Sequence, residues 1–97
     1  MSVLLEIIIN MIEPINEKIE VVLIFRLTPK PVTEIYKLKW RGKYYVISQT
    51  GYHYKIWEGR TRLHKFTVSS GNLDFRLRYD TENLAWILEE VSDGLAN

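Results

Sequence analysis

The chain has no cysteine among its 97 residues. It therefore has no disulfide framework and no thiolate that could act as a nucleophile or a metal ligand. Small secreted domains often depend on disulfides, so this absence favours a reducing compartment. We expect a cytoplasmic location.

Motifs for phosphate binding and catalysis are missing as well. The five glycines stand alone at predicted turns or in the tail, so no glycine-rich loop leads into a helix. No serine lies in a Gly-x-Ser-x-Gly elbow, and Ser69-Ser70-Gly71 is typical of a turn. The adjacent acids Glu89-Glu90 lie on a predicted strand and would point to opposite faces, which does not suit paired acid–base catalysis. We expect a protein that is not an enzyme and that holds no cofactor.

Histidine is scarce. His53 and His64 are the only two, and their separation along the chain matches no zinc motif. A metal site would need carboxylates such as Asp74 in addition, and no pattern brings these groups together. We expect no metal site, and a structural or surface role for both histidines.

The apolar N-terminal segment, residues 3–12, falls far short of the roughly 20 residues of a membrane span. It lacks a basic leader and a small-residue cleavage site, so we do not expect a signal peptide or any membrane contact. Its many isoleucines favour a strand, whereas the spacing of Leu4, Ile8 and Ile12 also permits a helix. It is either an N-terminal extension or a dimerisation strand, and Met11 is an alternative start.

Strand signals dominate the rest of the chain, which at 46% hydrophobic and 26% charged residues has the balance of a globular domain. Apolar alternation and turn residues predict strands at 18–27, 34–40, 43–49, 52–57, 62–69, 73–79 and 84–91. Arg41-Gly42 and Thr50-Gly51 are two of the predicted turns. The segment 84–91 also permits a short helix, but we favour a strand.

We therefore predict one all-β domain over residues 1–97, a small antiparallel meander forming a barrel or sandwich of six to seven strands. We expect it to be closed or nearly closed, with residues 92–97 as a frayed tail. Leu73, Phe75, Leu77 and Tyr79 should point inward from the most regular strand.

Charge is distributed unevenly although the net charge is only +1. Residues 28–79 carry eleven Lys or Arg against three acids, a net charge of +8, between acidic ends of −2 (residues 1–27) and −5 (residues 80–97). This basic middle is rich in Tyr and Trp. Positive side chains bind phosphates and exposed rings stack on bases, so the pattern indicates nucleic-acid contact.

Lys37 and Lys39 share one strand face and Arg76 and Arg78 share another, so the two strands would form a positive platform if they were neighbours. Trp40 or Trp57 would stack on bases if exposed. The alternative is a solvated outer face that suppresses aggregation. The candidate nucleic-acid contacts are Lys37, Lys39, Arg41, Lys43, Arg60, Arg62, Arg76, Arg78, Trp40 and Trp57.

Residues 3–12 and 19–25 carry more aliphatic surface than one sheet face can hide. This predicts a second function, a protein-interaction or homodimeric subunit that uses these apolar strands.

A set of motifs between residues 13 and 93 resembles the DUF6504-type family of small bacterial and archaeal proteins. The motifs are Glu13-Pro14-Ile15, the segment 39–46, Trp57, the segment 62–68, the segment 73–80 and Trp86-Ile87-Leu88. Similar modules lie at the C-termini of inactive Y-family-polymerase-like repair proteins. The resemblance implies an accessory role near DNA without catalysis, and it carries over no active-site residues.

Overall fold

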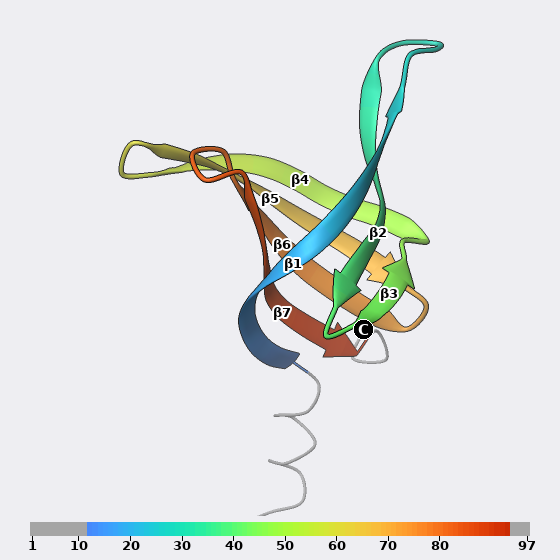
Figure 1. The fold of residues 1–97 in the computed structure, drawn as a ribbon, viewed down its shortest axis with the longest axis vertical. Helices are drawn as coiled ribbons and strands as arrows, with labels where there is room; N and C mark the ends of the chain where they lie inside the picture. The colour runs from blue at the N-terminus through green and yellow to red at the C-terminus, as the bar shows by residue number, and fades with distance from the viewer. Residues whose placement is uncertain (1–11, 94–97) are drawn as a thin grey trace, which may run out of the picture.

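The computed structural model describes residues 12–93, which form seven strands (Figure 1). In chain order these are β1 (Ile12–Arg26), β2 (Val32–Trp40), β3 (Lys43–Val46), β4 (Gln49–Glu58), β5 (Thr61–Ser70), β6 (Leu73–Asp80) and β7 (Ala85–Asp93). All pairs are antiparallel, in a single sheet of order β3-β2-β1-β7-β6-β5-β4. The all-β prediction is confirmed, and of the segment 84–91, residues 85–91 belong to strand β7 and not to a helix. Within residues 12–93 no helix is long and apolar enough to cross a membrane.

The sheet bends because β1 pairs with different partners along its length. Its first half pairs with β7, and its second half, from Glu20 onward, pairs with β2. Within the half that pairs with β7, β1 also has a bulge between Pro14 and Glu17, where Asn16 has a φ of +54°. As a result β1, β2 and β3 fold over the sheet of β4 to β7, with β1 crossing it at a steep angle (Figure 1).

The sheet is not closed. β3 and β4 stand at opposite ends of the strand order, although only Ile47 and Ser48 separate them in the chain. The edges meet at this link, where the Ile47 amide donates to the Tyr36 carbonyl (2.9 Å) and the Ser48 amide donates to the Ser69 carbonyl (2.8 Å). Beyond the link β2 and β4 share no ladder, so of the two predicted forms, barrel or sandwich, the open sheet is sandwich- or meander-like.

The core lies between the two folded parts. Phe75, Leu77 and Leu88 are fully buried, as are Leu38 from β2 and Val68 from β5. The register explains the grouping, because Phe75 lies directly opposite Val68, and Leu77 lies opposite Leu88. The predicted inward positions Phe75 and Leu77 are thus confirmed. Burying each such side chain contributes about 1.5–3 kcal/mol.

Three local predictions are wrong. Thr50-Gly51 is not a turn, since β4 runs through it with a bulge between Thr50 and His53. A Cβ at Gly51 would lie 3.3 Å from the Thr67 carbonyl oxygen, so glycine here allows a close strand approach and not a turn. Ser92 and Asp93, predicted to fray, pair with β6. β1 begins at Ile12 and not at residue 18, and residues 1–11, including most of the expected dimerisation strand, lie outside the described residues.

Two hairpins extend from the body and leave an opening between them. Figure 1 shows the β1–β2 hairpin rising at the top and the β4–β5 hairpin extending to the left. The β2–β3 turn is as predicted, with φ of +52° at Arg41 and +79° at Gly42, the left-handed pair that tight hairpin turns require. The opening is bounded by the inner faces of both projecting hairpins.

Candidate functional site

The predicted basic residues fall into separate groups. Lys37 and Lys39 lie on the outer face of β2, where their ammonium nitrogens lie 4.4 Å and 5.4 Å from the ring centroid of Tyr44. Arg76 and Arg78 lie on β6, and both β1 and β7 separate β2 from β6 in the sheet. The strands are not neighbours, so the single positive platform does not form.

Arg76 and Arg78 are also paired with carboxylates. Arg76 Nε lies 3.1 Å from Glu90, and Arg78 Nη1 lies 3.1 Å from Glu89, which also accepts a hydrogen bond from Lys65. These pairs offset the positive charge of this face. The outer surface of β6 is therefore a poor place for a phosphate.

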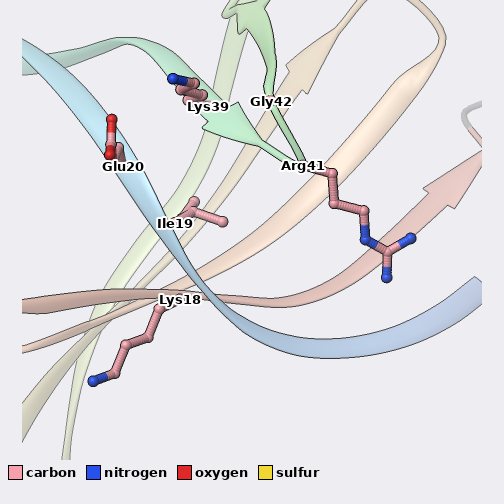
Figure 2. Close-up of a pocket in the computed structure, with 6 residues that line it drawn as sticks. All are labelled: Lys18, Ile19, Glu20, Lys39, Arg41 and Gly42. Atoms are coloured by element: carbon pink, nitrogen blue, oxygen red, sulfur yellow. The ribbon is translucent and has the colours of Figure 1, made fainter.

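A shallow groove of about 350 Å³ lies beside the β2–β3 turn and brings Lys18, Lys39 and Arg41 into one region. Figure 2 shows these three side chains pointing in different directions, so their charges do not converge on one point. Arg41 instead donates to Glu17 with its Nη2 2.6 Å from Oε2, and this hydrogen bond lowers the pKa of the Glu17 carboxyl. The groove is basic but is not a built anion site.

Trp40 is part of the structure and not a free ring. It is half-buried, its Nε1 donates to Glu17 (3.1 Å), and its ring packs edge-on against Phe75 with centroids 6.4 Å apart. Arg41 covers it at 4.7 Å from the ring centroid. The ring therefore cannot present a face to a ligand without disturbing the core.

Trp57 differs, because 66% of it is exposed near the tip of the β4–β5 hairpin. Arg62 lies directly opposite in the strand register, with its guanidinium carbon 5.3 Å from the Trp57 ring centroid. Arg60 is exposed in the turn that joins the two strands. Three of the predicted contacts are thus brought together at this tip.

From this tip a row of one lysine and three rings leads inward along the concave face. Lys55, His64, Tyr79 and Trp86 lie side by side across β4, β5, β6 and β7. Because alternate strand residues share a face, Arg62 belongs to the same surface.

The rings line a cavity of about 300 Å³, which we call the aromatic cleft. Its other wall is the inner face of the β1–β2 hairpin. The cleft is lined by Leu23, Thr33, Ile35, His53, His64, Phe66, Tyr79 and Trp86.

The rings of the cleft form a continuous series. His53 stacks on Phe66 with centroids 4.3 Å apart and planes inclined by 6°. Phe66 contacts Trp86 at 5.3 Å, and Trp86 contacts Tyr79 at 4.8 Å. Rings at these separations stabilise one another and hold flat faces in place.

The two histidines meet in the cleft. His53 Nε2 and His64 Nδ1 are 2.9 Å apart, so one ring nitrogen donates and the other accepts. Burial, the neighbouring His53, and the charges of Lys55 and Arg62 lower the pKa of His64. Among residues 12–93 no group of three or more His, Cys, Asp or Glu side chains could hold a metal ion.

The charged side chains that share a face with His64, namely Lys55 and Arg62, are positive. In the described part of the chain none of the residues that line the cleft is acidic. Glu58, the acid nearest in sequence to Trp57, pairs with Thr61 and so lies on the opposite face of the hairpin. Arrangement and charge together suit a ligand with flat rings and negative groups.

Sequence reasoning identified Trp57, Arg60 and Arg62 but did not place the histidines at a site. Alternation along a strand places His64 on the face of Phe66 and His53 on the face of Lys55, but it does not show that the two faces meet. The missing information was the register between β4 and β5, which the bulge near Gly51 shifts.

No protein-family model, curated protein or solved structure matches this chain. The resemblance to the DUF6504-type family stays a prediction from the quoted motifs.

Proposed function

We propose that this protein is a non-enzymatic module that binds single-stranded nucleic acid along the concave face between its two projecting hairpins. The observation that carries the proposal is the series of rings in the aromatic cleft, continued outward by exposed Trp57 and flanked by Lys55 and Arg62. Among residues 12–93 no acidic side chain lines this cleft.

Stacking and charge act together at such a surface. An unpaired base presents a flat face, and stacking it on an aromatic side chain contributes about 1–3 kcal/mol. Lys and Arg beside the rings neutralise phosphates and release counterions, so binding weakens as salt rises. A duplex keeps its bases stacked on one another, so single strands should bind more tightly than duplexes.

The predicted contact residues differ in the role that they would have in binding a strand. Trp57, Arg60 and Arg62 take the principal role, joined by Lys55. Lys37, Lys39 and Lys43 lie on the β2–β3 hairpin and offer only a secondary surface for phosphates, while Arg41 in its turn is engaged by Glu17. Arg76, Arg78 and Trp40 are left out, because their side chains are engaged by Glu90, Glu89 and Glu17.

Fluorescence anisotropy of labelled oligonucleotides at two salt concentrations tests the proposal. We expect micromolar binding of a single strand at low salt, weaker duplex binding, and a steep loss of affinity as salt rises. No binding of a single strand at low salt would refute it. An accessory role in DNA repair rests on the family resemblance alone and is tested only after binding is established.

A second candidate function is protein interaction through the β1–β2 hairpin. Phe25 and Leu27 near its tip are 64% and 68% exposed, which is unusual for large apolar side chains close together. Of the predicted apolar surface at 19–25, Ile19 and Val21 instead turn toward the core. The predicted homodimer would use the exposed remainder together with residues 3–11.

Light scattering coupled to size-exclusion chromatography tests this second function. A dimer that becomes a monomer on Phe25→Ser, or on removal of residues 1–10, supports it. A monomer in all three forms at high micromolar concentration removes its basis.

A further inference from the structure

The hydrogen bond between His53 and His64 limits how many protons the pair can hold. With the two ring nitrogens 2.9 Å apart, one carries the proton of the bond and the other must offer a lone pair. Protonating the acceptor nitrogen as well would break the bond, because two N–H groups would then face each other, one of them on a positively charged ring. Without a counter-charge, the pair therefore keeps the acceptor nitrogen unprotonated.

The surroundings of the pair add positive charge. Lys55 on β4 and Arg62 on β5 share its face, and both lower the pKa of His64, as do burial and His53. β6 contributes Tyr79 and β7 contributes Trp86. The facing hairpin contributes Leu23, Thr33 and Ile35, none of them charged. No lining group balances a second proton, so a negative ligand group has to do so.

We propose that His53, His64, Lys55 and Arg62 form a phosphate-binding subsite that takes up one proton from solvent when a backbone phosphate of a bound strand occupies it. The proposal rests on the proposed function and adds where a phosphate sits and how pH regulates binding. The acceptor nitrogen gains the proton, the bond between the histidines is replaced by N–H donation to phosphate oxygens, and the proton returns to solvent on release. No covalent bond forms or breaks.

The geometry suits such an exchange. The His53 ring is stacked on Phe66, with planes inclined by 6°, and this stacking does not depend on which ring nitrogen carries hydrogen. An imidazolium donates from both nitrogens, so the pair gains a donor as the phosphate arrives. The flat walls then leave room in the 300 Å³ cavity for a base beside the phosphate.

The sign of the pH dependence follows. Because the pKa of His64 lies below its ordinary value in the free protein, the His64 ring is largely neutral at neutral pH. A phosphate raises that pKa, so affinity for a strand grows as pH falls. One coupled proton gives at most about a tenfold change in Kd per pH unit.

Calorimetry of the full chain with a short oligothymidylate, in buffers of different ionisation heat, measures the protons taken up. We expect up to one proton per strand near pH 6.5 and a Kd that falls about tenfold between pH 7.5 and pH 6. His64→Gln keeps a hydrogen-bonding side chain without a titrating one, and we expect a Kd independent of pH. Trp57→Ala is the matched control, which weakens binding at every pH and leaves the proton uptake unchanged.

The outcomes separate the two proposals. If the unmodified chain binds the oligonucleotide without taking up a proton, the proposed subsite is wrong and the proposed function still stands. This measurement does not depend on whether any variant folds. If no strand binds, the proposed function fails, and the subsite is tested with sulfate, which does not titrate in this range. Sulfate-dependent movement of the histidine proton resonances at pH 6 supports it, and unmoved resonances at 50 mM sulfate overturn it.

Discussion

Phe66 and His53 face each other across β4 and β5, with ring centroids 4.3 Å apart and planes inclined by 6°. Their opposition in the register places a titratable ring flat against an apolar one in an open cleft. The same strand pair places Arg62 over Trp57 at the tip of the hairpin. One pairing register thus assembles both the stacking surface and its positive flank.

Removing the exposed ring should weaken binding without affecting the fold. Trp57→Ala deletes a side chain that is 66% exposed, and a lost base stack of about 1–3 kcal/mol corresponds to a 5- to 150-fold rise in Kd for a single strand. Anisotropy titration measures it. Tyr52→Ala is the control, since Tyr52 is 74% exposed on the opposite face of the same strand. Equal losses in both variants would argue against a ring-specific contact.

Charge removal should alter the salt dependence. Arg62→Gln deletes a phosphate contact, so the slope of log K against log salt for a single strand should become shallower by about 0.7. Arg76→Gln is the control, because Arg76 already pairs with Glu90 and should leave the slope unchanged. The measurement is the anisotropy titration repeated at four salt concentrations. A change in slope for Arg76→Gln alone would place the strand on the outer face.

The core and the projecting hairpin should respond differently to the same substitution. Phe75 is fully buried, so Phe75→Ala should lower the free energy of unfolding by about 3–5 kcal/mol through lost burial and a cavity. Phe25→Ala, at a residue that is 64% exposed, should change it by less than about 1 kcal/mol. Urea denaturation followed by tryptophan fluorescence compares them. A large loss for Phe25→Ala would show that the β1–β2 hairpin packs more tightly in solution.

Acid should loosen the contact that joins β1 to the β2–β3 turn. The hydrogen bond from Arg41 lowers the pKa of Glu17, so the stabilisation is present above the ordinary pKa of a glutamate and is lost as pH falls through the lowered value. Carbon-detected NMR should find the pKa of the Glu17 carboxyl below the ordinary value of a glutamate, and Arg41→Ala should move it back up. An unchanged titration in Arg41→Ala would mean that the pair does not persist in solution.

The strands and most of their inward faces could be predicted from the sequence, because alternation acts locally. Phe75 and Leu77 in β6 and the Arg41-Gly42 turn are examples. Irregularities could not be predicted in the same way. The bulge opposite Val22 and Leu23 leaves Tyr36 exposed, although its spacing from Leu38 and Trp40 placed it on their face. The glycine at position 51 suggested a turn, whereas in the structure it allows β4 to approach Thr67 closely.

The candidate site was harder to predict, because it depends on which strands become neighbours. Lys37 with Lys39 and Arg76 with Arg78 each followed the predicted alternation, yet β1 and β7 lie between their strands. His53 and His64 carry no local motif, and they meet only through the β4–β5 register and the opening left by the unclosed sheet. Long-range pairing of this kind leaves little trace in residue spacing.

Chemical-shift mapping of the full chain with a short single-stranded oligonucleotide at low salt tests the central claim most directly. If the concave face is the binding surface, the largest shifts will fall on Lys55, Trp57, Arg62 and His64. Shifts concentrated instead on Lys37, Lys39 and Tyr44, or no shifts at millimolar oligonucleotide, would contradict it.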